Sequence, residues 1–121
     1  MNVDNVKSQM RKGMLEYCIL LLLHREASYA SDIIADLKEA KLIVVEGTLY
    51  PLLTRLKNDE LLSYEWVESR QGPPRKYYKL TSKGELFLNE LQTAWDELSD
   101  TVNHLRIKLI TDHNNEKDIN D

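Results

Sequence analysis

The chain has 121 residues, of which 42% are apolar and 30% charged, and this suits one globular domain with a core large enough to fold alone. Its longest apolar run, Met14–Leu23, contains Glu16 and is far shorter than the about 20 residues that a membrane-spanning helix needs. No small-residue cleavage site follows this run, so no export signal is expected. Cys18 is the only cysteine, which excludes an internal disulfide and fits a reducing cytoplasm.

The net charge of −4 argues at first against a nucleic-acid partner, but the charges are unevenly distributed. Residues 1–80 hold 12 basic and 11 acidic residues, whereas residues 81–121 hold 4 and 9. The acidity therefore belongs to the C-terminal third of the chain. The segment Ser69–Leu80 has four basic residues and no acidic one, which is a localised indication of nucleic-acid binding.

Two helices are predicted at the start of the chain. The first runs from about Lys7 to His24, after a loose polar segment, and its apolar side chains lie nearly all round beyond Leu15, which is typical of a central buried helix. The second runs to about Glu39 from Ser28, a residue well suited to cap a helix N-terminus.

The third predicted helix lies in the segment EGTLYPLLTRL, Glu46–Leu56, although this segment contains Pro51. If the helix begins at Glu46 or Gly47, Pro51 falls at the end of the first turn, where its missing N–H costs little. The predicted buried stripe is Leu49, Leu52, Leu53 and Leu56. The residues predicted to lie elsewhere on the helix are Thr48, Tyr50, Thr54, Arg55 and Lys57, so its first turns present a polar and aromatic surface.

A β-hairpin is predicted after the third helix. The segment LLSYEWVES alternates with period two and puts Leu62, Tyr64 and Trp66 on one face. The segment RQGPPR is predicted as a turn because Gly and two Pro cannot continue a ladder, and KYYKL is the returning strand. Alternation buries one of Tyr77 and Tyr78 and exposes the other, but the pattern leaves open which one.

The last predicted helix carries a heptad seam. Thr81 or Ser82 caps it, and about 30 residues at 1.5 Å each give a length of about 45 Å. A body this small cannot cover such a helix, so we expect it to pair with a second copy of the chain. Trp95 would then face its symmetry mate, and two indoles can hold a flat apolar ligand between them. The seam residues are Leu88, Leu91, Trp95, Leu98, Val102, Leu105 and Leu109.

The order of these elements predicts a mainly α protein with a small β-hairpin, arranged as a winged helix-turn-helix with a long C-terminal dimerisation helix. Residues 1–81 would form the DNA-binding domain, residues 82–112 the dimerisation helix and residues 113–121 a polar tail. The third helix would enter the major groove, while the basic hairpin reaches phosphates or the minor groove. The candidate DNA contacts are Thr48, Tyr50, Thr54, Arg55, Arg75, Lys76, Tyr77 and Tyr78.

No catalytic pattern emerges from the sequence. The three histidines, His24, His104 and His113, lie far apart, and no Cys–His or Ser–His–Asp arrangement can be placed. All four glycines are isolated, so no phosphate-binding loop is expected. We therefore expect no enzymatic activity, no metal site and no cofactor.

In these segments the sequence resembles PadR-family transcriptional regulators, in particular the small subfamily with a single long C-terminal helix. The resemblance covers about residues 10–105. The pair GTLYPLL and GPPRKYYKLT at this separation is its most specific feature. The matching segments are RKGMLEYCILLLL, SYASDI, EGTLYPLLTRLKNDELL, YEWVESRQGPPRKYYKLTSKG and the helix that carries Trp95.

The resemblance implies a winged-helix homodimer that represses transcription and releases DNA on binding a small effector. In the multidrug-sensing members a seam tryptophan lines a flat apolar pore at the dimer centre, and Trp95 matches it. By the same resemblance, the pore residues would be Tyr17, Leu21, Leu91, Trp95 and Ser99. Two features depart from the family: Asn58–Glu60 stands where a glycine commonly ends the third helix, and the bulk of Tyr17 and Leu21 leaves a filled pore as an alternative.

The sequence thus predicts a cytoplasmic, homodimeric transcriptional repressor without a membrane segment. Its expected partners are a pseudo-palindromic DNA duplex, a second copy of the chain and a flat aromatic small molecule. The alternative is a winged-helix protein-interaction module that dimerises but does not bind DNA.

Overall fold

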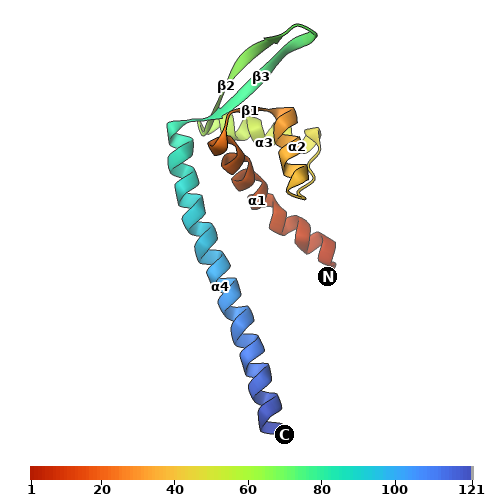
Figure 1. The fold of residues 1–121 in the computed structure, drawn as a ribbon, viewed down its shortest axis with the longest axis vertical. Coiled ribbons are helices and arrows are strands. Elements are labelled where there is room, and N and C mark those ends of the chain that lie inside the picture. The colour runs from red at the N-terminus through yellow and green to blue at the C-terminus, as the bar shows by residue number, and fades with distance from the viewer. Residues whose placement is uncertain (121) are drawn as a thin grey trace. The chain divides into compact units, whose positions relative to one another are not determined.

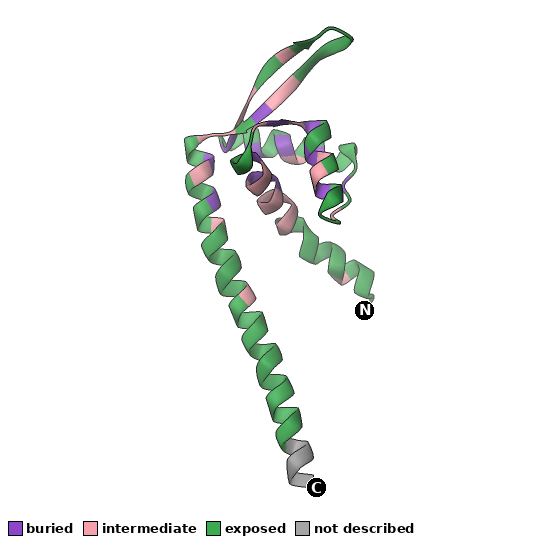
Figure 2. Ribbon diagram, in the orientation of Figure 1, coloured by how far each residue is buried: buried purple, intermediate pink, exposed green. Residues whose placement is uncertain are grey.

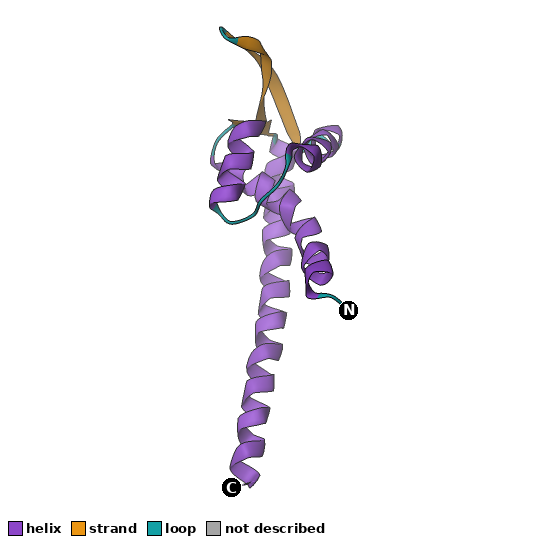
Figure 3. Cartoon of the chain, turned by 90° about the vertical axis from the view of Figure 1, so that its right-hand side faces the viewer, coloured by secondary structure: helices purple, strands orange, loops and turns teal. Residues whose placement is uncertain are grey.

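The structure, a computed structural model, describes the backbone of residues 1–120 and the side chains of residues 1–115. Its contacts divide the chain into two units, one up to Leu88 and one from Asn89 onward. Figure 1 labels the elements and Figure 3 colours them by type. In chain order they are α1 (Val3–Arg25), β1 (Ser28–Tyr29), α2 (Ala30–Glu39), α3 (Glu46–Asn58), β2 (Leu62–Ser69), β3 (Gly72–Leu80) and α4 (Ser82–Asn120).

The predicted fold class is confirmed. Three helices pack together in the first unit, and the β2–β3 hairpin extends beyond them as the wing (Figures 1 and 3). We use the name wing for the hairpin from Leu62 to Leu80 throughout. The chain is therefore a winged helix-turn-helix followed by a long helix.

Helix α1 begins earlier than the sequence predicts. It starts at Val3 rather than near Lys7, because Asn2 caps it. The side-chain oxygen of Asn2 accepts a hydrogen bond from the N–H of Asp4 at 2.7 Å, and the Asp4 carboxylate lies in the first turn, where negative charge is favoured. The expectation of a loose N-terminal segment is thus wrong for these residues.

Helix α2 begins later than predicted, since Ser28 is not its cap. Ser28 and Tyr29 form the short strand β1, and Tyr29 occupies the cap position without a side-chain hydrogen bond. The Ser28 hydroxyl donates instead to the carbonyl of Glu26 at 3.4 Å. The capping prediction fails because this backbone joins a sheet before it enters the helix.

Helix α3 begins at Glu46, as predicted, but Pro51 lies farther inside it than expected. As the sixth helical residue, Pro51 removes the N–H that would bond the carbonyl of Gly47 four residues earlier. Gly47 and Pro51 are both exposed, so water can solvate that carbonyl. Of the predicted buried stripe, Leu49, Leu53 and Leu56 are buried and Leu52 is half-buried.

The sheet has three strands in the order β1-β3-β2, where the sequence predicted two. Strand β3 pairs antiparallel with β1 through Ser28 with Tyr78 and Tyr29 with Tyr77. The connecting turn is shorter than predicted, because β3 already begins at Gly72 and includes both prolines of the RQGPPR segment. A β-bulge between Val67 and Ser69 lies opposite these prolines, which is a place where a strand tolerates missing N–H donors.

The core of the first unit lies where the helices meet the base of the wing (Figure 2). Tyr78 of β3 is buried with 4% of its surface exposed, which settles the choice between the two adjacent tyrosines. The largest fully buried side chains are Ile19, Leu20, Ile33, Leu37, Leu49, Leu53 and Leu88.

The start of α4 is fixed to the first unit. The Thr81 hydroxyl accepts a hydrogen bond from the N–H of Gly84 at 2.9 Å, so Thr81 is the predicted cap. Nδ1 of His24, in the last turn of α1, lies 2.7 Å from a carboxylate oxygen of Glu85. The helix continues to Asn120, past the end predicted near residue 112, so the segment expected as a tail contributes its last turns.

Candidate nucleic-acid interface

The N-terminal half of α3 presents polar and aromatic side chains to solvent. Leu49 and Leu53 point into the core, which leaves Thr48, Tyr50 and Thr54 on the exposed surface of the helix. The first turn is held by the N–H groups of Thr48 and Leu49, which both donate to the Val45 carbonyl at 3.0 Å. These exposed side chains are three of the predicted DNA contacts.

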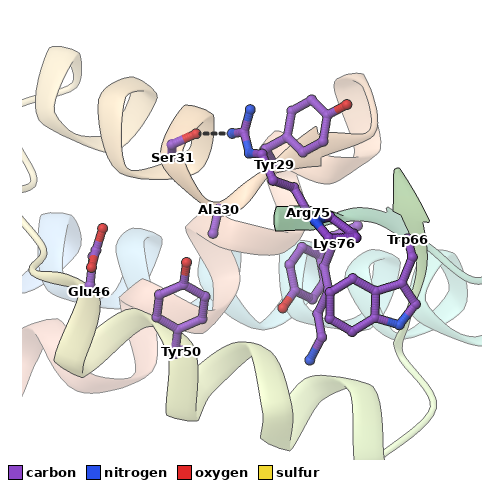
Figure 4. A pocket seen from close by; sticks show the side chains of 10 residues that line it. Tyr29, Ala30, Ser31, Glu46, Tyr50, Trp66, Arg75 and Lys76 are labelled. Carbon is purple, nitrogen blue, oxygen red and sulfur yellow. Dashed lines mark hydrogen bonds between the residues drawn. The ribbon is translucent and has the colours of Figure 1, made fainter. Parts of the chain in front are cut away.

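The wing meets α3 and the start of α2 around a cleft of about 430 Å³ (Figure 4). Aromatic rings and two cations are prominent in its lining, which comes from five different elements. Tyr78, although buried, contributes to this lining, while its neighbour Tyr77 does not. The lining residues are Tyr29, Ala30, Ser31, Glu46, Tyr50, Trp66, Pro74, Arg75, Lys76 and Tyr78.

The two cations that line the cleft are held by neighbouring groups. Nη2 of Arg75 donates to the Ser31 hydroxyl at 2.5 Å, and its guanidinium carbon lies 4.0 Å from the centre of the Tyr29 ring. The ammonium of Lys76 lies 4.5 Å from the ring centre of Tyr64 and 5.3 Å from that of Trp66. Cation–π contacts of this kind orient a positive charge without neutralising it.

Burial raises the pKa of the Tyr78 hydroxyl, and the nearby Tyr50 and Tyr64 hydroxyls raise it further. Tyr78 is thus uncharged at neutral pH, and it adds no negative charge to a cleft whose cations are Arg75 and Lys76. Glu46 also lines the cleft, so an anionic group is favoured on the side of Arg75 and Lys76, with the exposed ring of Tyr50 between them and Glu46 (Figure 4).

Arg55 has a different environment from the other predicted DNA contacts. Its guanidinium forms an ion pair with the carboxylate of Glu16 on α1, although the Arg55 side chain is largely exposed. The structure therefore brings Tyr50, Arg75 and Lys76 to one cleft and directs Arg55 to another element. To bind a phosphate, Arg55 would have to exchange Glu16 for it.

The predicted ligand residues belong to both units of the chain. Tyr17 and Leu21 on α1 are half-buried. On α4, Leu91 and Ser99 are half-buried and Trp95 is 43% exposed. The Ser99 hydroxyl donates to the Trp95 carbonyl at 2.7 Å, a local bond within the helix.

The predicted dimer seam is exposed in the single chain, except at its start. Leu88 is buried and Leu91 half-buried, whereas four later seam residues are exposed on α4, most of which is coloured as exposed in Figure 2. Their exposed fractions lie between 54% and 72%. These residues are Leu98, Val102, Leu105 and Leu109.

The sequence did not indicate four residues that contact the cations of this surface. Tyr29 and Ser31 hold Arg75, Glu16 pairs with Arg55, and Trp66 is 62% exposed beside Lys76. Trp66 could have been found, because the period-two pattern puts it beside Tyr64 on an edge of the sheet. The other three contacts join residues far apart in sequence, and no local pattern signals them.

Among the described residues, no group of three or more His, Cys, Asp or Glu side chains is arranged to hold a metal ion. None of the described helices has the length and apolarity to cross a membrane.

Comparison with known proteins places residues 19–90 in register with the PadR-like transcriptional regulator family. A solved structure of a PadR-like transcription factor from Bacteroides fragilis is 81% identical and matches 84% of this chain and 98% of its own, with a TM-score of 0.73. A PadR family transcriptional regulator from Eggerthella lenta is 34% identical and matches 85% of this chain and 90% of its own, with a TM-score of 0.79. An uncharacterized protein of Lysinibacillus sphaericus is 30% identical over 100 residues, which are 80% of this chain and 92% of that protein.

Proposed function

Because this chain belongs to the PadR-like transcriptional regulator family, we propose that it is a cytoplasmic, homodimeric repressor that a small planar apolar molecule releases from DNA. The family makes it a DNA-binding transcriptional regulator. Dimerisation, repression, the effector and the residues that contact DNA are the parts that we add.

The cleft between α3 and the wing is the observation that supports the proposed DNA-binding surface. It joins the exposed Tyr50 to Arg75 and Lys76, which come from a segment without acidic residues. A helix and a basic hairpin that share one surface can contact the major groove and an adjacent phosphate strand together. The proposed DNA contacts are therefore Thr48, Tyr50, Thr54, Arg75, Lys76 and Tyr77, and Arg55 joins them if it leaves Glu16.

The exposed seam of α4 supports a dimer. Leu98, Val102, Leu105 and Leu109 repeat at heptad spacing and lie in solvent in a single chain. A second copy of the same helix would bury them, because identical heptads pack against each other. Two copies of α3 would then enter successive major grooves about 34 Å apart on a pseudo-palindrome.

The exposed indole of Trp95 supports the proposed effector site. It belongs to the same seam, so a two-fold axis near it would set two indoles face to face. Tyr17, Leu21, Leu91 and Ser99 would complete the walls. An effector releases the protein from DNA only if it binds the DNA-free state more tightly, by about 1.4 kcal/mol for each tenfold loss of DNA affinity.

A salt titration of duplex binding tests the proposed surface. Each phosphate contact makes the plot of log affinity against log salt steeper by about 0.9. Arg75→Ala or Lys76→Ala removes one contact from each protomer, so each change should make the plot for a dimer flatter by about two. Lys12→Ala removes an exposed lysine of α1 and serves as the matched control. The slope should be unchanged in that variant.

The same titration separates this proposal from its rival. A winged-helix module that only binds other proteins would show weak duplex binding with the same slope in all three variants. Unchanged slopes for Arg75→Ala and Lys76→Ala would therefore reject the wing as a DNA contact.

A further inference from the structure

We propose that Tyr29 and Ser31 are positioning residues for Arg75, and that they orient its guanidinium in advance for a phosphate of the DNA backbone. This inference rests on the proposed function, since it needs Arg75 to contact DNA. It gives a role in DNA binding to two residues that lie outside the wing and do not themselves contact DNA.

The guanidinium of Arg75 is held on one edge and on one face. On its edge, Nη2 donates to the Ser31 hydroxyl at 2.5 Å. On its face, the Tyr29 ring lies with its centre 4.0 Å from the guanidinium carbon. Figure 4 shows Arg75 between these two side chains at the border of the cleft, with the hydrogen bond to Ser31 drawn.

The two holding residues are themselves fixed to the strand that carries Arg75. Tyr29 pairs with Tyr77 in the β1–β3 ladder, and their ring centres lie 4.9 Å apart. Arg75 and Tyr77 are two residues apart on β3, so their side chains leave the same face of the strand. Ser31 follows in the first turn of α2. Tyr29, Ser31 and Tyr77 thus form one locally rigid group around the Arg75 guanidinium.

This arrangement leaves Arg75 able to bind an anion. A guanidinium has five N–H donors, and Ser31 accepts from only one of its terminal nitrogens in the structure. The hydroxyl and the ring carry no negative charge, so they orient the cation without neutralising it. Arg55, by contrast, is paired with the carboxylate of Glu16, which competes directly with phosphate.

Orienting an arginine in advance matters because a free side chain loses rotamer freedom when it binds. That loss corresponds to about two- to tenfold in affinity for one long side chain. A side chain that the protein already holds in place avoids most of this loss. We therefore expect Ser31→Ala and Tyr29→Leu each to weaken duplex binding by about two- to tenfold for each Arg75 involved.

Fluorescence anisotropy with a labelled DNA duplex, long enough for both protomers, tests the inference. Phosphate contacts are independent of sequence, so a duplex of arbitrary sequence at low salt suffices. Tyr29→Phe keeps the ring and should bind like the wild type, which makes it the matched control for Tyr29→Leu. Thermal unfolding of every variant identifies any loss of DNA affinity that arises because the variant is unfolded.

A double-mutant cycle distinguishes positioning from a direct or merely structural role. In an Arg75→Ala background, Ser31→Ala and Tyr29→Leu should have no further effect on affinity, because the side chain they orient is gone. A further loss in that background would overturn the inference. Tighter binding by Ser31→Ala alone would also overturn it, since Ser31 would then restrain Arg75 from DNA.

The outcome for Arg75→Ala separates this inference from the proposed function. If Arg75→Ala weakens binding while Ser31→Ala and Tyr29→Leu do not, only the positioning role fails. If Arg75→Ala leaves affinity unchanged, the proposed wing contact fails as well.

Discussion

At the scale of single residues, Gly84 is the position where the fold allows no side chain. A Cβ atom added there would lie 2.2 Å from the carbonyl oxygen of Leu61 and 2.8 Å from a methyl carbon of Leu80. The oxygen belongs to the backbone and accepts the N–H of Thr81, so it cannot move aside cheaply. This contact seats the first turn of α4 against the base of the wing.

We predict that Gly84→Ala lowers the free energy of unfolding by about 2 kcal/mol, the usual range for overpacking a tight site. Gly13→Ala is the matched control, because no atom lies within 4 Å of a Cβ added in the middle of α1. That change should instead raise the free energy of unfolding by about 0.5–1 kcal/mol through the helix propensity of alanine. Urea unfolding of both variants measures the difference, and a neutral Gly84→Ala would contradict this account of the contact.

Single-residue roles were predictable where a local pattern determines them. The sequence predicts Thr81 or Ser82 as the cap of α4 and a start of α3 at Glu46 or Gly47, because capping and helical periods involve neighbours in sequence, and the structure has Thr81 and Glu46 in these places. Ser28 was misassigned as a cap, since nothing local reveals that it pairs with Tyr78 across the sheet. The ion pair of Arg55 with Glu16 escaped prediction for the same reason.

At the scale of elements, the helices and the wing follow from their periods. A two-residue strand such as β1 is too short to show any period, and for this reason the sheet was predicted with two strands. The wing also extends through Pro73 and Pro74, because its bulge accommodates their missing donors. Strand β2, by contrast, was recognisable from its alternation, and the end of β3 from its place after the turn.

The exposed seam of α4 leads to a prediction about assembly. Leu105→Asp should shift the protein toward monomers and raise its dimer dissociation constant by at least about tenfold, because two carboxylates would face each other across the two-fold axis. Ile107 is the matched control, being 64% exposed where Leu105 is 60% exposed, yet off the seam on the opposite side of the helix. Sedimentation velocity compares Leu105→Asp with Ile107→Asp. Equal effects of the two changes would show that the seam is not the interface.

At the scale of the whole molecule, the sequence predicted the family and the order of the elements except for β1, because both rest on motifs that local residues carry. It also predicted that basic residues gather in the wing while acidic residues gather toward the C-terminus. It could not predict the cleft, whose lining comes from five separate elements. The positioning of Arg75 by Tyr29 and Ser31 therefore appears only in three dimensions.

Selection of bound sequences from random DNA tests the central claim most directly, namely that a dimer presents two copies of α3 and the wing to one duplex. The account predicts enrichment of two inverted half-sites whose centres lie about one helical turn, or a multiple of it, apart. No enrichment, or a single half-site without an inverted partner, would contradict it.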